Sequence, residues 1–180
     1  RESEEIAKKV NKAIFPGLQG GPHMNAIAGI AVALGEAAQP SFRVYAEQVL
    51  KNAKAMEAVL RKENIRMLTG GTDNHLILAD VFGSLSISGK EAETVLDEVG
   101  ITLNKNAIAD DTRPPLDPSG IRFGTPPMTT RGMKEAEATK VAELLMLTLR
   151  NKDDASKKTE IKKEVQGLCE QFPVPESFIK

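Results

Sequence analysis

The chain has 180 residues, which is enough for one domain, or for one domain and part of a second. Its 24 Lys and Arg residues balance 25 Asp and Glu residues, so it has no basic excess with which to bind nucleic-acid phosphates. A single cysteine excludes an internal disulfide framework and fits a reducing cytosol. The two histidines argue against a histidine-rich metal site. No apolar run approaches the ~20 residues that are needed to cross a bilayer.

The first 38 residues predict two helices joined by a glycine-rich turn. Apolar residues four apart predict a helix that runs to about Phe15, and FPGLQGGP (15–22) then breaks the pattern. From His23 to Ala38 the chain is almost all small and apolar, which is typical of a helix with neighbours on several sides. These helices have no strands of their own, so we expect residues 1–38 to belong to a domain whose sheet lies upstream.

The remaining chain, residues 39–180, predicts a separate small α+β domain. Helices alternate with short strands in this part of the sequence, and helices are expected to cover one face of a small sheet. The expected elements, in chain order, are a helix over 41–64, a strand over 75–81, a helix over 88–100, a strand over 101–108, a proline-rich loop over 109–120, a strand over 121–125, a helix over 131–150 capped by Thr129 or Thr130, and a last helix around 161–172.

The glycines of GLQGGP (17–22) have two interpretations. Successive glycines before a helix can present backbone N–H groups to a phosphate, and the helix dipole adds to the attraction. Most glycine-rich turns are only turns, however. The P-loop pattern is absent, because no Gly-Lys-Ser or Gly-Lys-Thr follows.

Two polar positions near the strands also have two interpretations each. Arg122, in SGIRFGTP, can form a bidentate pair with a carboxylate, or it can simply face solvent from the polar side of its strand. Asn106, in NKN, can bind a polar heterocycle through its amide, or it can serve the turn that follows. His75 has Asp73 nearby, but no poised nucleophile completes a triad, and Cys169 is expected to pack among apolar residues.

Five stretches taken together identify a family. The sequences FPGLQGGPHMNAIAGIAVAL, LTGGTDNHLILADV, ITLNKNAI, SGIRFGTPPMTTRG and FPVP, in this order, resemble the C-terminal part of serine hydroxymethyltransferase. Each stretch alone is moderately specific, but five in register over nearly the whole chain are highly specific. The resemblance implies the small C-terminal domain of a fold-type I enzyme dependent on pyridoxal 5'-phosphate, preceded over 1–38 by helices from the end of the large domain.

The resemblance also implies an activity and roles for particular residues. Family members convert serine and tetrahydrofolate into glycine and methylenetetrahydrofolate. By this resemblance, Arg122 holds the substrate carboxylate, Gly21 with its neighbour Gly20 offers backbone donors to the cofactor phosphate, and Asn106, Pro114, Pro115 and Leu116 contact folate. The triplet Pro-Pro-Leu replaces a Ser-Pro-Phe-like triplet of the family, so only the backbone role of that loop carries over.

One departure limits what this chain is expected to do. The family's cofactor-binding lysine lies in a Thr-Thr-His-Lys stretch, and no such stretch occurs here. We therefore expect a fragment without catalytic residues or a metal site, inactive alone, from a cytoplasmic enzyme that is a homodimer or tetramer. Two alternatives remain: an aminotransferase-like relative on the same fold, and a non-catalytic isolated small domain.

Overall fold

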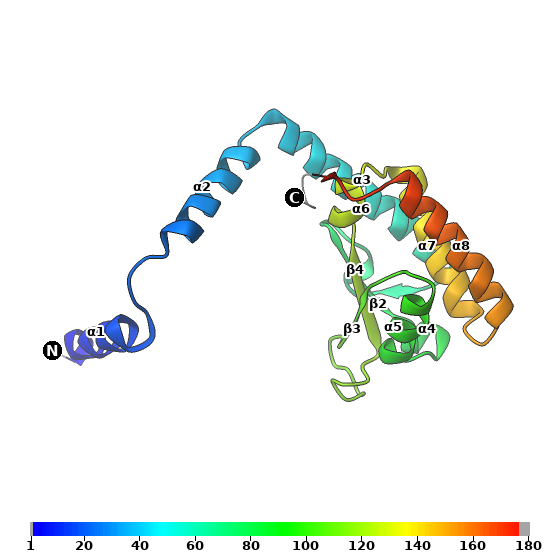
Figure 1. The fold of residues 1–180 in the computed structure, drawn as a ribbon. Coiled ribbons are helices and arrows are strands. Elements are labelled where there is room, and N and C mark those ends of the chain that lie inside the picture. The colour runs from blue at the N-terminus through cyan, green and yellow to red at the C-terminus, as the bar shows by residue number, and fades with distance from the viewer. Residues whose placement is uncertain (1, 177–180) are drawn as a thin grey trace. The chain divides into compact units, whose positions relative to one another are not determined.

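The computed structural model describes residues 2–176 of the chain (Figure 1). The chain divides into two compact units, Arg1–Arg43 and Val44–Lys180, and each is described by itself.

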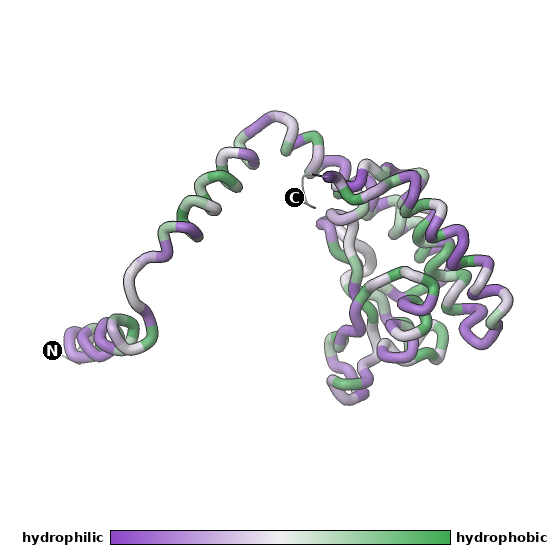
Figure 2. The backbone as a smooth tube through the Cα atoms, in the orientation of Figure 1, coloured by the Kyte–Doolittle hydropathy of each residue, from purple (hydrophilic) through white to green (hydrophobic). Residues whose placement is uncertain are grey.

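The first unit contains two helices and the glycine-rich turn. Helix α1 spans Glu2–Lys12, a π-helical segment with a kink at Phe15 and Pro16 spans Ala13–Leu18, and α2 spans Met24–Ala37. All of residues 3–43 are exposed. These exposed residues include the apolar side chains of α2, a helix that Figure 2 shows as mostly hydrophobic. This unit therefore contributes no buried core within the described residues.

The second unit is built from a small sheet and its helices. Helix α3 begins in the last residues of the first unit and spans Pro40–Lys62. The other elements are β1 (Arg66–Met67), a 3₁₀ turn (Leu68–Gly70), β2 (Leu76–Asp80), α4 (Val81–Leu85), α5 (Gly89–Glu98), β3 (Asn104–Asn106), β4 (Gly120–Gly124), α6 (Pro126–Thr130), α7 (Glu135–Arg150) and α8 (Ala155–Gln171).

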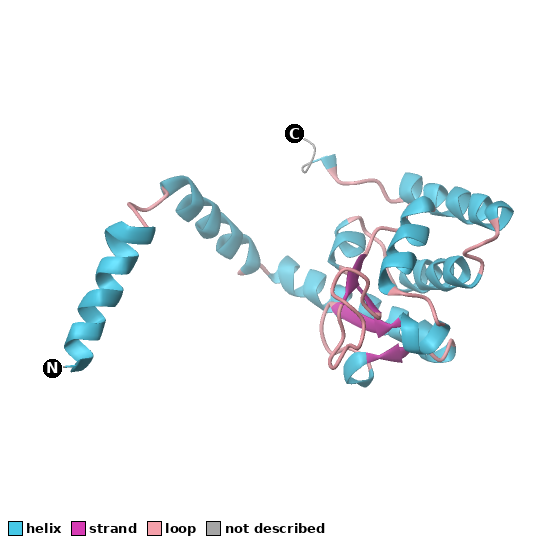
Figure 3. Cartoon of the chain, turned by 90° about the horizontal axis from the view of Figure 1, so that it is seen from below, coloured by secondary structure: helices cyan, strands magenta, loops and turns pink. Residues whose placement is uncertain are grey.

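The four strands form one antiparallel sheet in the order β1-β2-β4-β3. Helices pack on one side of this sheet, as Figure 3 shows. The main core joins residues of α3, α5 and α7 to the inward-facing residues of β2 and β4, and α8 adds a second, smaller cluster around Ile161 and Val165. The predicted α+β fold, a small sheet covered by helices, is confirmed.

The two faces of the sheet differ in burial, because successive residues of a strand point to opposite faces. Ile77, Ala79 and Ile121 point to the helices and are completely or almost completely buried. Leu78 and Arg122, which pair across β2 and β4, lie on the other face, and Arg122 is exposed. The sheet therefore has an open face that the helices do not cover.

Several predicted boundaries are wrong, and the largest error concerns the helix predicted over 131–150. A short helix, α6, ends at Thr130, Gly132 adopts a φ of 89°, and α7 begins only at Glu135. Thr129 caps no helix, because its hydroxyl donates to Thr125 O. The strand predicted over 101–108 is reduced to three residues, and the sequence patterns did not reveal β1 or α4.

Candidate functional site

The open face of the sheet presents Arg122 at its centre. Arg122 lies in the middle of β4, paired with Leu78 of β2 on one side and Asn104 of β3 on the other. Its side chain is exposed, and among residues 2–176 it makes no hydrogen bond or ion pair. The guanidinium therefore keeps its fork of donors available for a planar anion such as a carboxylate.

Glycines flank this arginine two residues away on each side, and both sit against neighbouring backbone. A Cβ on Gly120 would lie 2.8 Å from Asn106 O, and one on Gly124 would lie 2.6 Å from His75 O. Real Cβ atoms do not approach that closely, so only glycine lets β4 lie so near its neighbours. The two glycines therefore fix the strand that carries Arg122.

A hollow of about 500 Å³ lies beside Arg122. Its lining includes the side chains of Arg122 and Asn104, with His75, Leu76 and Pro126 around them. One cation, one amide, one imidazole and one hydroxyl (Thr102) among apolar residues match the composition of a site for a small polar molecule. Asn106 and the residues 114–116 do not line this hollow, so the structure does not gather all the residues singled out from the sequence.

Asn106 nevertheless shares the open face with Arg122. Asn106 pairs with Gly120, two residues before Arg122 in β4, and Asn104 pairs with Arg122 itself. The Asn106 amide donates 2.7 Å to Ala107 O, which leaves its carbonyl oxygen and one N–H for another partner.

The strand that carries both asparagines is anchored through the residue between them. Glu93 of α5 accepts the backbone N–H of Lys105 at 3.0 Å and the Lys105 ammonium at 2.5 Å. The hydrogen bond from the Lys105 side chain, followed by that from its backbone, lowers the pKa of Glu93. Lys105 is thus a structural partner of α5 on the helix side of the sheet.

The proline-rich loop between β3 and β4 is organised around one carboxylate. Asp111 Oδ1 accepts from Ser119 Oγ at 2.7 Å and Arg113 N at 3.0 Å, and Oδ2 accepts from Ser119 N and Ile108 N. Burial alone would raise the pKa of Asp111, but these hydrogen bonds, those of Ser119 first, outweigh it and hold that pKa well below its ordinary value. Asp111 therefore ties the two ends of the loop together.

Arg113 holds the tip of the same loop. Its side chain forms an ion pair with Asp117, donates to Asp117 O at 3.0 Å, and lies 4.4 Å from the centre of the Phe82 ring. Between Arg113 and Asp117 the chain turns, with Asp117 N donating to Pro114 O. The intervening Pro114, Pro115 and Leu116 are exposed, and Leu116 has 80% of its surface free.

Gly20 and Gly21 of GLQGGP have no steric reason within the described residues to be glycine, whereas a Cβ on Gly17 would lie 3.2 Å from Lys12 O. A Cβ on Gly20 or Gly21 would meet nothing within 4 Å, and neither glycine has a positive φ. The following helix α2 starts at Met24, and its N-cap His23 makes no side-chain capping bond. Gly20 and Gly21 are exposed, and their backbone N–H groups make no backbone hydrogen bond within residues 2–176, so they are accessible to a partner outside the segment.

Other residues considered from the sequence have structural surroundings. Asp73 pairs with Lys54 rather than with His75, and Cys169 packs beside the smaller core cluster as expected. Within residues 2–176, no group of three or more His, Cys, Asp or Glu side chains is arranged to hold a metal ion.

The sequence interpretation missed Asn104, His75 and Pro126 as neighbours of Arg122, and Asp111 as the organiser of the loop. Only Asp111 had a local signal: an Asp two residues before the Arg113 backbone N–H is typical of an Asx turn. The other three come together through strand pairing, which one strand read alone does not reveal.

A small antiparallel sheet has helices on one face and, on the other, an exposed arginine that makes no side-chain hydrogen bond or ion pair among residues 2–176, and together these define a small α+β domain with a cationic group on its open face. The family model of serine hydroxymethyltransferase matches residues 1–145 of the chain. The chain therefore belongs to the serine hydroxymethyltransferase family, a family of transferases, and the aminotransferase-like alternative is disfavoured.

Across residues 2–176, none of the helices combines the length and the apolar character that a membrane crossing needs.

Proposed function

We propose that this chain is the C-terminal part of a serine hydroxymethyltransferase that interconverts serine and tetrahydrofolate with glycine and 5,10-methylenetetrahydrofolate. The observation that carries the proposal is Arg122, exposed and unpaired among the described residues on the open sheet face, in a chain of this family. Serine and glycine share an α-carboxylate, which is the anion that a guanidinium binds best in a bidentate pair.

In this proposal Arg122 binds and orients the amino-acid substrate. Two parallel N–H···O bonds fix the plane of the carboxylate and the direction of the Cα substituents. The Gly120 and Gly124 contacts hold the backbone of β4 in place, so the attachment point of the arginine is already positioned when substrate arrives. Orientation is what an enzyme contributes when a cofactor carries the bond-breaking chemistry.

The folate would bind along the same open face. Asn106 has an amide carbonyl and an N–H to spare, which suits a pterin ring that both donates and accepts hydrogen bonds. The tip at Pro114, Pro115 and Leu116 offers apolar surface, held in one shape by Asp111 and Arg113. A rigid tip loses little conformational entropy on binding.

Gly20 and Gly21 fit a contact to the phosphate of pyridoxal 5'-phosphate. Open space surrounds both positions where a Cβ would be, and the neighbouring N-terminus of α2 lacks a side-chain cap. Their backbone N–H groups would donate to the phosphate oxygens, aided by the helix dipole. When bound, the cofactor supplies the electron sink for the reaction.

Catalysis also needs residues that this sequence does not contain. The 180 residues include no Thr-Thr-His-Lys stretch, so the cofactor lysine would come from another part of the enzyme. We therefore propose that the chain alone is inactive, that residues 1–38 belong to the large domain, and that the intact enzyme is a cytoplasmic homodimer or tetramer. The single cysteine suits a reducing cytoplasm.

The test of the Arg122 role is Arg122→Lys in the intact enzyme. A point charge replaces a planar fork, so serine should bind at least about tenfold more weakly, the loss of roughly one charge-assisted hydrogen bond. Arg150→Lys is the matched control, because Arg150 pairs with Glu63 at the end of α7 and should leave serine affinity unchanged. Equal serine affinity in the Arg122→Lys enzyme would contradict the assignment.

The inactivity of the chain alone is tested separately. Residues 1–180 are mixed with pyridoxal 5'-phosphate, tetrahydrofolate and labelled serine, and glycine formation is measured. We expect none above the protein-free rate. Turnover by the chain itself would refute the proposal that a missing part supplies the lysine.

A further inference from the structure

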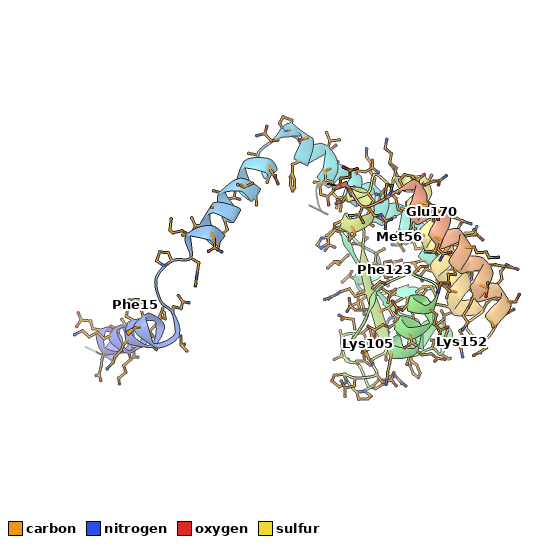
Figure 4. The ribbon with its side chains drawn as sticks, viewed as in Figure 1. Phe15, Met56, Lys105, Phe123, Lys152 and Glu170 are labelled. Atoms are coloured by element: carbon orange, nitrogen blue, oxygen red, sulfur yellow. The ribbon has the colours of Figure 1, made fainter. Side chains whose placement is uncertain are left out.

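A second cavity, of about 220 Å³, lies on the helix side of the sheet. It is bounded by α3, β4, α6, α7 and α8 and by the chain before β3. Met56 of α3 and Phe123 of β4, both labelled in Figure 4, form part of its wall. All its lining residues belong to the second unit, so the cavity does not depend on the first.

The wall of this cavity is almost entirely apolar. Its principal members are Met56, Leu103, Phe123, Met128, Met133 and Leu144. Two polar side chains also reach it, and both have partners elsewhere. Thr102 Oγ1 donates to Asp97 at 3.3 Å, and Arg131 donates from Nε to Phe172 O and from a terminal nitrogen to Cys169 O.

These contacts decide what can occupy the cavity. A water held in a cavity needs two to four polar partners, and this wall offers few, because Thr102 Oγ1 donates to Asp97 and Arg131 already uses two of its five N–H donors on Phe172 O and Cys169 O. An enclosed apolar cavity of about 150 Å³ in another protein binds benzene or xenon, and the present space, about 220 Å³ and partly open to solvent, is large enough for a ligand of that size. Three flexible methionines at the wall can also adjust to the shape of a ligand.

We propose that this cavity is a binding site for a small apolar molecule, of the size and character of a monocyclic aromatic. The site adjoins the one proposed for serine and shares part of its wall, but it does not include Arg122. Val165, Leu168 and Cys169 of α8 contribute to its wall, and they lie beyond residues 1–145, where the family match ends. The inference stands whether or not the proposed function is correct.

The cavity adjoins the hollow beside Arg122. Both spaces are lined by Thr102, Leu103, Phe123, Gly124 and Pro127, so they share a wall that includes part of β4. An occupant on the helix side therefore touches the strand that carries Arg122.

The six methionines of the chain provide the test. Methyl-labelled methionine in the whole chain is followed by NMR while benzene is added. Met56, Met128 and Met133 line the cavity and should shift and then saturate. Met67 and Met146 are buried elsewhere in the core and Met24 is exposed, so these three are internal controls that should not move.

A pair of variants locates the binding. Cys169→Leu adds side-chain volume at the wall and should abolish the saturable shifts, whereas Cys169→Ala leaves the space open and should retain them. The wild-type titration stands on its own if Cys169→Leu fails to fold.

Three outcomes would overturn the proposal. They are an absence of saturable shifts up to the solubility of benzene, equal shifts in all six methionines, and tighter binding of benzoate than of benzene. The last outcome would mean that Arg131 recognises a carboxylate there, so that the ligand is not apolar.

Discussion

At the scale of single residues, the candidate site depends on contacts that only particular side chains permit. The backbone that carries Arg122 stays in place because Gly120 and Gly124 let the carbonyl oxygens of Asn106 and His75 come close. The loop beside it stays in place because one carboxylate, Asp111, accepts four hydrogen bonds. Both features give residue-level predictions.

We expect Gly120→Ala to destabilise the second unit by about 1–3 kcal/mol, the usual cost of forcing an extra group into packed structure. The added methyl would meet Asn106 O at 2.8 Å and Ile108 Cγ2 at 2.7 Å. The measurement is the free energy of unfolding in urea. Gly167→Ala is the control, because Gly167 lies within α8 with nothing near its Cβ, and there alanine should stabilise by roughly 0.5–1 kcal/mol. Equal effects at the two positions would contradict the close-approach argument.

We expect Asp111→Asn to destabilise the chain at pH 7 by about 2 kcal/mol, because hydrogen bonds to a charged acceptor are lost. The folded-state pKa of Asp111 is lowered, so its contribution is full above the unfolded value of about 3.9 and is lost as pH falls toward the folded pKa. The difference in the free energy of unfolding between wild type and Asp111→Asn should therefore become smaller below about pH 4.

The urea midpoints of both proteins between pH 3 and pH 7 would check this. Asp110→Asn is the matched control, because Asp110 is exposed and its φ of 56° suits asparagine as well as aspartate. A difference in urea midpoint between wild type and Asp111→Asn that stays constant with pH would show that the charge of the Asp111 carboxylate does not contribute to stability.

At the scale of elements, the short edge strand β3 is held as much by α5 as by the sheet. It pairs with β4 through only three residues, and Glu93 of α5 binds its central residue Lys105 through both carboxylate oxygens. Because β3 carries Asn104 and Asn106, this anchor also positions the open face of the site.

We expect Glu93→Gln to loosen β3 without unfolding the domain. The amide oxygen can still accept the Lys105 N–H, but the ion pair is lost, at a cost of about 1 kcal/mol for a partly exposed pair. The Lys105 amide should then exchange its hydrogen about fivefold faster, which hydrogen-exchange NMR measures. The lowered pKa of Glu93 means that wild-type protection is present above about pH 4.3 and falls at more acid pH.

Glu143→Gln is the control for this variant. Glu143 is exposed on α7 and makes no ion pair among residues 2–176, so exchange at Lys105 should not change. Unchanged exchange at Lys105 in Glu93→Gln would mean that the ion pair between Glu93 and Lys105 does not help to hold the strand.

The sequence predicts an element correctly where local contacts define its ends, and it fails where tertiary contacts define them. The α5 helix was predictable, because Ser88 caps it through Glu91 N and Gly100 follows it with a φ of 88°. The start of α7 was not predictable from the sequence, because the Thr129 hydroxyl makes hydrogen bonds in the interior instead of capping a helix. It accepts from the buried Asn52 amide and donates to Thr125 O.

Strand β3 was overestimated for a similar reason. Ile101 and Leu103 belong to the predicted strand because of their apolar pattern, but they pack against the core from irregular chain. Of the candidate site, Arg122 and Asn106 were identified from the sequence, whereas their placement on one open face required the register of β3 and β4.

At the scale of the whole molecule, the two units differ in how much of their own structure they bury. The second unit has a core that joins three helices to two strands, but every residue from 3 to 43 is exposed. The family match extends over both units, since it covers residues 1–145. We therefore propose that the first unit packs, in the intact enzyme, against a part of the large domain that these residues do not include.

The exposed helix α2 gives the whole-molecule prediction that the isolated chain associates with itself. Its apolar side chains include Ile27, Ile30 and Leu34, with 46%, 59% and 65% of their surface exposed. Burying such a surface against a second copy would gain roughly 25 cal/mol for each Å² of apolar area removed from water. Light scattering should show a mass that rises above the monomer value with concentration.

Substitutions on α2 decide whether that helix is responsible. Ile30→Glu with Leu34→Glu places two charges on the apolar surface and should return the chain to a monomer, since burying unpaired charge is costly. Lys9→Glu with Lys12→Glu on α1 changes charge in the same unit without touching α2 and should leave association intact. A wild-type chain that stays monomeric at high concentration would show that exposed apolar surface on α2 is insufficient for self-association, because the hydrophobic gain must exceed the entropy lost when two chains join.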